Sequence, residues 1–306
     1  MNRVLVIGAA GMIGRKLTAR LLKEGVGELI QQDVVPFEGT VSDLSAPGEA
    51  EKLIAKRPDL IFHLAAVVSG EAEADFDKGY RVNLDGTRYL FEAIRKEGYK
   101  PKVVFTSSIA VFGAPFPEAI GDEFLNAPLT SYGTQKAIGE LLLSDYSRRG
   151  FFDGIGLRLP TICVRPGKPN KAASGFFSGI LREPLAGQEA VLPVPDTVRH
   201  WFASPRAAIE FLIHASRINT ELLGTRRNLS MPGLSCTVAE QIAALGRVAG
   251  DKATRLIRRE PDQTIMRIVE GWPRNFDARR ALALGFRPDP CFEDIIRFHL
   301  EDELGR

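Results

Sequence analysis

Near its N-terminus the chain reads Val4-Leu5-Val6-Ile7-Gly8-Ala9-Ala10-Gly11-Met12-Ile13-Gly14, and this stretch decides the fold. An apolar run, then glycines, then an amphipathic stretch over 13–23 predict a buried strand, a tight turn and a helix. Glycines at 8, 11 and 14 would let a pyrophosphate approach the helix N-terminus, where free N–H groups favour an anion. Because packing glycines can share this spacing, it is the position straight after the first strand that indicates a dinucleotide site.

The alternation of strand and helix continues to residue 159. Apolar runs predict further strands at 28–33, 59–64, 102–106 and 154–159, and helical patterns cover 49–56, 80–96 and 131–149. Strands that alternate with helices on right-handed crossovers form a parallel sheet covered on both faces. The sequence therefore predicts an α/β fold with a doubly wound parallel sheet of the Rossmann type.

The pattern changes after residue 159. Prolines and glycines over 160–195 predict a loop-rich, irregular segment, and helices are predicted at 204–217, 237–249 and 292–303. Substrates of doubly wound folds bind beyond the carboxyl ends of the strands, which this second half could cover. We expect a dinucleotide-binding domain over 1–162 and a smaller, irregular α+β part over 163–306 that is mainly substrate-binding. Segments near 196–230 are expected to return to the sheet.

The composition narrows the class of protein. The 306 residues are 44% hydrophobic and 25% charged, which excludes global disorder, and 40 Lys+Arg against 38 Asp+Glu argue against a nucleic-acid or membrane-surface binder. Three cysteines and four histidines are too scattered for a disulfide framework or a zinc site, so no metal is expected. Because a strand begins almost at once and no apolar run could span a membrane, we expect a cytoplasmic protein.

Acidic residues follow the second predicted strand. Asp33 ends that strand, 19 residues after Gly14 (33 − 14). A carboxylate there can accept both adenosine ribose hydroxyls and repel a 2′-phosphate, which favours NAD over NADP, although Asp33 could instead be a turn or capping residue. Arg15 would weaken this preference if it pointed at the ribose. Asp43 with Leu44 is a candidate for the adenine edge, or Asp43 is simply an acid in a loop.

A tyrosine and a lysine one helical turn apart give the sharper chemical signal. Tyr132 and Lys136 share a helix face, so the ammonium lies near the phenol and favours the phenolate of a general base. Ser107 and Ser108 end a predicted strand, where a hydroxyl either faces the crevice or serves a turn. Each signal alone could arise by chance, but their order after the glycine turn predicts a catalytic site.

Taken in order, these motifs resemble the NAD-dependent epimerase/dehydratase family of extended short-chain dehydrogenases/reductases over essentially the whole chain. The resemblance rests on Gly8, Gly11 and Gly14, Asp33, His63-Leu64-Ala65-Ala66, Asn83-Leu84-Asp85-Gly86-Thr87, Thr106-Ser107-Ser108, Tyr132 with Lys136, and Arg158-Leu159-Pro160. It implies that Ser108 polarises the reacting oxygen, Tyr132 transfers its proton, and Lys136 holds the ribose and lowers the pKa of Tyr132. It also implies a homodimer, in which the helices over 80–96 and 131–149 pair into a four-helix bundle.

The same resemblance implies NAD as the cofactor, with Pro160 and Thr161 beside the nicotinamide. The full set of expected cofactor contacts is Gly8, Gly11, Met12, Ile13, Gly14, Asp33, Asp43, Leu44, Leu64, Ala65, Ala66, Asn83, Tyr132, Lys136, Pro160 and Thr161.

Two stretches of the second half narrow the resemblance further. Residues 165–171 and 196–202 resemble the D-erythronate dehydrogenase subgroup, which oxidises a sugar acid at C2 to a 2-oxo acid. The implied reaction is D-erythronate to 2-oxo-tetronate, with this small sugar acid bound by Ser108, Tyr132, Arg165 and Arg199. Each arginine could grip a carboxylate bidentately or form a surface ion pair. His200 is expected to be packed or hydrogen-bonded rather than catalytic.

Two other functions fit part of the pattern. A nucleotide-sugar 4-epimerase or dehydratase would share every catalytic residue, but it needs a larger site for uridine and diphosphate, and no segment indicates one. A dehydratase would also carry an acidic pair beside its catalytic hydroxyl, whereas Ser108 is followed by Ile109-Ala110. A non-catalytic dinucleotide sensor would lack the Tyr132/Lys136 pair. Substrate stereochemistry, reaction direction and the arginine that binds the carboxylate stay open.

Overall fold

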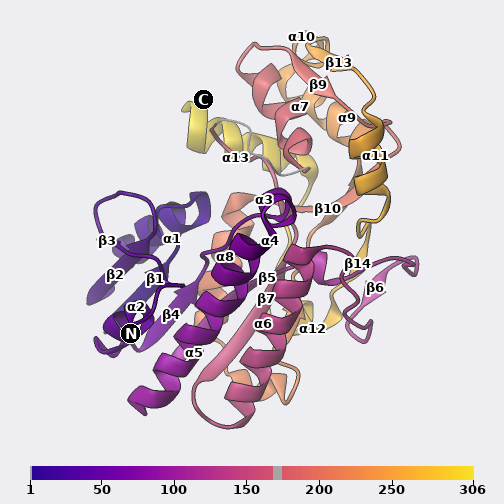
Figure 1. Cartoon of the computed structure of the whole chain (residues 1–306). Helices are drawn as coiled ribbons and strands as arrows, with labels where there is room; N and C mark the ends of the chain where they lie inside the picture. Colours follow the sequence, from indigo (N-terminus) through magenta and orange to yellow (C-terminus); the bar gives the residue numbers. More distant parts are fainter. Residues whose placement is uncertain (1, 168–173) are drawn as a thin grey trace. The chain divides into compact units, whose positions relative to one another are not determined.

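The largest sheet of the described residues has seven strands in the order β11-β7-β5-β4-β1-β2-β3, and all of them except β11 come from residues 3–159 (Figure 1). The computed structural model describes residues 2–167 and 174–306. The strands are β1 (Arg3–Ile7), β2 (Glu28–Asp33), β3 (Thr40–Val41), β4 (Leu60–His63), β5 (Lys102–Ser108), β7 (Asp153–Leu159) and β11 (Asn228–Ser230). β1 pairs in parallel with β2 on one side and β4 on the other, so the strand order reverses beside β1. This topology confirms the predicted doubly wound parallel sheet.

Helices cover the two faces of this sheet because its central strands are apolar on both sides. β4 is buried along its whole length, and β1 is buried from Val4 onward. α2 (Glu49–Ile54), α5 (Gly86–Glu97) and α6 (Ser131–Arg148) lie on one face (Figure 1). α1 (Met12–Lys23) lies on the other, where Arg20 pairs with Glu210 of α8 (Pro205–Arg217). Each of these helices was predicted.

The connection from β4 to α5 contains helical turns that the sequence did not predict. The chain first forms two short helices, α3 (Ser69–Ala74) and α4 (Phe76–Gly79), and then a π-helix at Tyr80–Asp85 that runs directly into α5. The predicted helix over 80–96 is therefore present, and its first six residues are π-helical. A π-helical turn has no residue signature of its own, and such turns are frequent at functional sites.

The described residues divide into two compact units. The first, here called the sheet unit, comprises residues 1–111, 130–158 and 209–230, and the second unit comprises residues 112–129, 159–208 and 231–306. The sheet unit has its own apolar core, which includes Leu5, Leu90 and Phe105. The second unit has another, which includes Phe177, Leu245 and Ile295.

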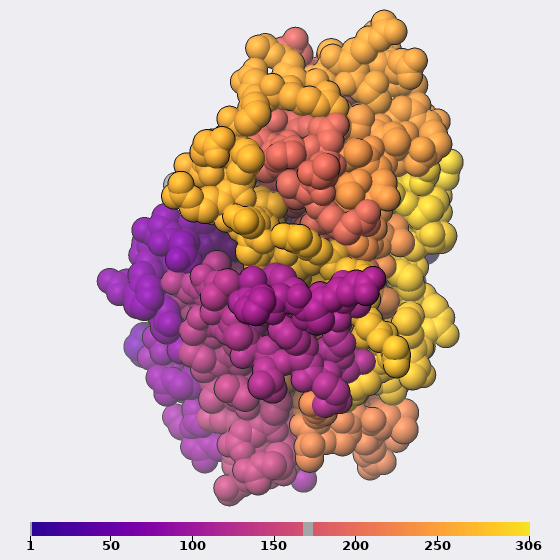
Figure 2. Space-filling model, turned by 90° about the vertical axis from the view of Figure 1, so that its right-hand side faces the viewer, coloured from indigo at the N-terminus to yellow at the C-terminus, as the bar shows by residue number. Residues whose placement is uncertain are grey.

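The second unit is built from three small sheets and several helices. β12 (Leu234–Thr237), β10 (Arg199–Ala203) and β8 (Thr161–Ile162) form one sheet, β13 (Ile257–Arg259) pairs with β9 (Ala190–Leu192), and β14 (Phe276–Asp277) pairs with β6 (Ile120–Gly121). The last pairing joins distant parts of the chain, and in Figure 2 the magenta segment around β6 lies beside the golden segment around β14. The helices are α7 (Gly175–Leu185), α9 (Val238–Ala249), α10 (Asp251–Thr254), α11 (Gln263–Glu270), α12 (Arg279–Ala283) and α13 (Phe292–Leu304).

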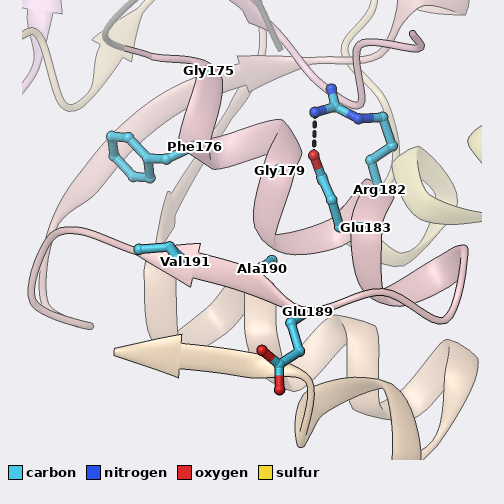
Figure 3. A pocket seen from close by; sticks show the side chains of 8 residues that line it. All are labelled: Gly175, Phe176, Gly179, Arg182, Glu183, Glu189, Ala190 and Val191. Carbon is cyan, nitrogen blue, oxygen red and sulfur yellow. Dashed lines mark hydrogen bonds and ion pairs between the residues drawn. The ribbon is translucent and has the colours of Figure 1, made fainter. Parts of the chain in front are cut away.

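The prediction that residues 160–195 are irregular is wrong over α7 and β9. Gly175, Gly179 and Pro184 suggested breaks, but α7 buries Phe177, Ile180 and Leu181 at helical spacing, and Pro184 lies in its last turn. A pocket of about 220 Å³ lies between α7 and β9, where Arg182 pairs with Glu183 (Figure 3). No predicted site residue lines this pocket. No helix in the part of the chain that the structure describes is long and apolar enough to cross a membrane.

Candidate active site

The glycine turn between β1 and α1 has no room for side chains. Gly8 has φ +88°, and a Cβ there would lie 2.7 Å from the backbone N of Ala65. A Cβ at Gly14 would lie 2.1 Å from the carbonyl oxygen of Gly8. The N-cap of α1, Gly11, makes no side-chain cap and no acidic residue occupies the first turn, so N–H groups of the first turn are left for an anion. This cradle fits the pyrophosphate of a dinucleotide.

Asp33 lies beside this turn, at the end of β2. Its Oδ2 accepts a hydrogen bond from Ala10 N–H at 2.9 Å, and its Oδ1 accepts one from Val34 N–H at 2.7 Å. Arg15 is turned toward the same loop, where its Nε donates to the Ala10 carbonyl at 2.7 Å. The acid and the glycine turn predicted from the sequence are therefore adjacent.

The other predicted adenine contacts are already engaged in the protein. Asp43 accepts hydrogen bonds from the backbone and hydroxyl of Ser45 and pairs with Arg81 at 2.8 Å. Burial alone would raise the pKa of Asp43, but the bonds from Ser45 and the charge of Arg81 outweigh it and lower that pKa. Leu44 is buried in the apolar core of the sheet unit.

Asn83, on the π-helix, clamps the loop that follows β4. Its Oδ1 accepts from Val67 N–H at 2.7 Å, and its Nδ2 donates to Val67 O at 3.0 Å and to Gln135 Oε1 at 2.7 Å. The loop begins with Leu64 and Ala65, whose N–H groups both donate to Ile7 O. The predicted cofactor contact Asn83 thus holds the segment 64–67 through its own side chain.

The three predicted catalytic residues come from β5 and α6. Ser108 is half-buried at the end of β5, and its Oγ accepts from Ala110 N–H at 3.1 Å. Tyr132 lies in the first turn of α6, behind the N-cap Thr130, whose side chain accepts from Gly133 N–H. Lys136 Nζ donates to the carbonyl of Thr106 at 2.8 Å and lies 5.8 Å from the centroid of the Tyr132 ring. The predicted Tyr/Lys pairing on one helix face is confirmed.

The burial of Lys136 sets the electrostatics of this region. Desolvation lowers the pKa of Lys136 to about 8, and the negative charge of Glu140 partly opposes that fall. Desolvation and the nearby Lys136 charge lower the pKa of His63 to about 3, so His63 is neutral at pH 7. An amine with a pKa this close to neutral can change its protonation state together with that of an adjacent phenol.

The sequence interpretation missed a buried network behind these residues. The carboxylate of Glu140 accepts from the Ser107 hydroxyl and, bidentately, from Arg158. Glu140 follows Lys136 by one helical turn, as Lys136 follows Tyr132. The 132–136–140 spacing was the available signal, but a glutamate on a helix is too common to stand out.

His200, in the second unit, is packed and hydrogen-bonded as expected. Its Nδ1 donates to Pro273 O at 2.9 Å, its Nε2 accepts from the Thr161 hydroxyl at 2.7 Å, and its ring stacks on Phe177. Burial lowers the pKa of His200 to about 4, against the opposing bond to Pro273. Pro160, the other predicted nicotinamide neighbour, is buried.

The two predicted substrate arginines have structural contacts in the second unit. Arg199 donates to Ser235 O at 2.9 Å and pairs with Glu240 at 3.3 Å. The backbone N–H of Arg165 donates to Ser178 Oγ at 3.0 Å. Of the distinctive 165–171 stretch, residues 168–171 lie outside the described residues. Among the residues that the structure describes, no group of three or more His, Cys, Asp or Glu could hold a metal ion.

Comparison with known proteins finds one family model and several relatives. Residues 4–203 match the model of the NAD dependent epimerase/dehydratase family. The chain is 48% identical to a D-erythronate dehydrogenase of Cupriavidus necator, over 98% of both chains, and 42% identical to one of Haemophilus influenzae, over 99% of this chain and 100% of that protein. It is also similar to the crystal structure of a nucleoside-diphosphate-sugar epimerase from Agrobacterium tumefaciens, with 67% identity, a TM-score of 0.94 and coverage of 99% and 95% of the two chains.

Proposed function

The chain belongs to the NAD dependent epimerase/dehydratase family, and we propose that it oxidises D-erythronate at C2 to 2-oxo-tetronate with NAD. The observation that carries the substrate is the match, over nearly the full length of each chain, to two proteins with that name from different organisms. The site supports dehydrogenase chemistry, because a hydroxyl, a phenol and a buried ammonium come from adjacent elements of the sheet unit.

In the proposed mechanism three side chains act on the C2 hydroxyl of the substrate. Ser108 hydrogen-bonds the hydroxyl oxygen, and the phenolate of Tyr132 removes its proton. The ammonium of Lys136 favours that phenolate and also binds the nicotinamide ribose. NAD, when bound, supplies the acceptor for the hydride that leaves C2. The products are NADH and a 2-oxo acid, and the proton remains on Tyr132 until solvent takes it.

Cofactor binding is assigned to the glycine turn and Asp33. The tight turn, which has no room for a Cβ at Gly8 or Gly14, and the uncapped N-terminus of α1 suit a pyrophosphate. The carboxylate of Asp33 suits two ribose hydroxyls and repels a 2′-phosphate, so we propose NAD rather than NADP. Pro160 and Thr161 are proposed to border the nicotinamide.

The substrate carboxylate is proposed to bind an arginine of the second unit. Arg165 and Arg199 are the candidates, since a guanidinium fork matches a carboxylate. Arg199 would have to exchange its pairing with Glu240 for the substrate. Replacement of the correct arginine by lysine should raise KM for the sugar acid and leave KM for NAD unchanged.

The proposal is tested by following NADH formation with a panel of four-carbon sugar acids, other 2-hydroxy acids and UDP-sugars. We expect turnover with D-erythronate and NAD, little with NADP, and none with UDP-sugars. Turnover that requires a UDP-sugar would overturn the proposed substrate.

A nucleotide-sugar epimerase is the second candidate, because the 67% identical structure carries that name. An epimerase returns its hydride to the substrate and accumulates no NADH. Measuring both NADH and the epimeric composition of a UDP-sugar after incubation separates the two functions.

We further propose that the sheet unit corresponds to the NAD-binding domain predicted over 1–162 and that the second unit is mainly substrate-binding. The protein is proposed to work in the cytoplasm as a homodimer through α5 and α6. A solution mass from light scattering of twice 33.6 kDa is expected.

A further inference from the structure

Glu140 is a buried carboxylate next to the proposed catalytic residues but not among them. Only 1% of its surface is exposed. Its Oε1 accepts from the Ser107 hydroxyl at 2.6 Å and from Arg158 Nε at 2.9 Å, and its Oε2 accepts from Arg158 Nη2 at 2.8 Å. Burying a carboxylate costs free energy. A buried, fully paired carboxylate next to the proposed catalytic residues is therefore expected to have a role.

We propose that Glu140 is a positioning residue that holds the strand end carrying Ser108 and keeps Lys136 in its ammonium form. This inference rests on the proposed function, in which Ser108 and Lys136 act on the substrate and the cofactor. Glu140 itself is not proposed to contact the substrate or the cofactor. It acts indirectly, through its hydrogen bond with Ser107 and through its negative charge.

The positioning role follows from how the end of β5 is tied to its neighbours. Lys136 donates to the carbonyl of Thr106, and Glu140, one turn later on α6, accepts from the hydroxyl of Ser107. The Thr106 hydroxyl donates to His63 O of β4 at 3.0 Å. Two consecutive residues are thus fixed by side chains of α6, and the next residue is Ser108. Loss of one tie would let the Ser108 hydroxyl move relative to Tyr132.

The electrostatic role follows from the charges around Lys136. Tyr132 and Glu140 face it from α6, His63 of β4 is neutral, and Arg158 of β7 is paired with Glu140. Burial lowers the pKa of Lys136, and Glu140 is the group that raises it. Without this charge Lys136 would lose its proton at a lower pH and would cease to favour the Tyr132 phenolate.

The test compares pH profiles of kcat/KM for D-erythronate and NAD in three proteins: the wild type, Glu140→Gln, and the double variant Glu140→Gln/Arg158→Gln. The double variant is included because it removes both charges of the ion pair and leaves no unpaired buried charge. The alkaline limb should move down by about one pH unit in both variants, since one neighbouring charge at protein dielectric is worth about that much. This gives roughly a tenfold loss at about pH 9, against about a twofold loss at pH 7. Glu140→Asp, which keeps the charge, should restore the limb.

Two further variants separate the two roles. Ser107→Ala removes the tie but keeps the charge, so kcat should fall several-fold while the alkaline limb stays in place. Asp153→Asn is the matched control, because Asp153 also pairs with an arginine, Arg227 at 3.1 Å, but begins β7, whereas Arg158 lies near its end. It should lower the melting temperature without moving the limb.

The inference would be overturned if the alkaline limb of the pH profile were unchanged in the two neutral variants, Glu140→Gln and Glu140→Gln/Arg158→Gln. An equal shift of that limb in Asp153→Asn would also overturn it. So would failure of both neutral variants to fold, since Glu140 would then serve folding in general. NADH fluorescence titrations across the same pH range give a second readout, because Lys136 is proposed to bind the ribose. They keep the two proposals distinguishable: if D-erythronate is not a substrate, the proposed function fails while the pH dependence of NADH binding still tests Glu140.

Discussion

Tyr132 is the proposed general base, and the proposed reaction depends on it. Tyr132→Phe removes only the phenolic oxygen, so kcat should fall about 10³-fold, in the range of general-base catalysis. The melting temperature and the Kd for NADH should stay near wild type, because the ring still packs beside Lys136. Initial rates of NADH formation, with NADH fluorescence as the binding control, check this. Near-wild-type turnover by the variant would mean that another group is the base.

Asp33 is the residue that we propose to set the preference for NAD over NADP. In Asp33→Asn the side-chain oxygen can still accept from Ala10 N–H, so the turn should survive, but the charge that repels a 2′-phosphate is gone. We expect kcat/KM for NAD to fall about tenfold or more, as for the loss of a charged hydrogen bond, and the preference over NADP to shrink. Asp43→Asn is the control and should leave the NAD/NADP ratio unchanged. An unaltered ratio in Asp33→Asn would remove Asp33 from the ribose.

At the scale of elements, the junction of β1 and α1 depends on Gly14. An added methyl would meet the Gly8 carbonyl at 2.1 Å, and backbone on both sides prevents relief without a shift of α1. Gly14→Ala should therefore cost about 3 kcal/mol of unfolding free energy, as strong overpacking does, and abolish NADH binding. Gly121→Ala, whose methyl would meet no atom within 4 Å, is the control. Urea denaturation and NADH titration of both variants provide the comparison, and equal behaviour of the two would refute the steric argument.

The strands and helices of the sheet unit could be predicted because their signals are local. β1 and β4 are continuous apolar runs, and the ends of α6 agree with the sequence to within one residue. Ser204, the first residue of the helix predicted at 204–217, caps α8, since its Oγ accepts from Ala207 N–H. Sequence spacing also indicates the glycine turn, Asp33 and the Tyr132/Lys136 pair. The central residues of the candidate site could therefore be predicted from the sequence without knowledge of any contact.

What could not be predicted depends on tertiary contacts. α7 contains two glycines and a proline, and it forms because its apolar face packs into the core of the second unit. The clamp of Asn83 on Val67 and Gln135, and the capture of Ser107 and Arg158 by Glu140, join residues from 16 to 52 positions apart. No local pattern marks which buried polar groups will meet.

At the scale of the whole molecule, two of the buried histidines, from different units, have strongly lowered pKa values. His63 in the sheet unit has a pKa of about 3, and His200 in the second unit a pKa of about 4, both chiefly because burial disfavours the charged ring. In the unfolded chain each would titrate near 6.5. Between these values the unfolded state binds more protons than the folded state, so stability is full above about pH 6.5 and falls as the pH drops toward 4.

This difference predicts an acid-sensitive fold. At about pH 5 each histidine should contribute a loss of about 2 kcal/mol relative to neutral pH, because 1.5 pH units separate that pH from the unfolded pKa. Urea denaturation of the wild type at the two pH values measures the total. His63→Gln and His200→Gln should each be less stable than wild type at neutral pH, since both lose packing, yet each should lose about 2 kcal/mol less on acidification. His214→Gln, at a histidine that is only partly buried, is the control and should retain the full wild-type loss. An acid loss that is equal in all four proteins would place its origin in the carboxylates of ion pairs rather than in the two buried rings.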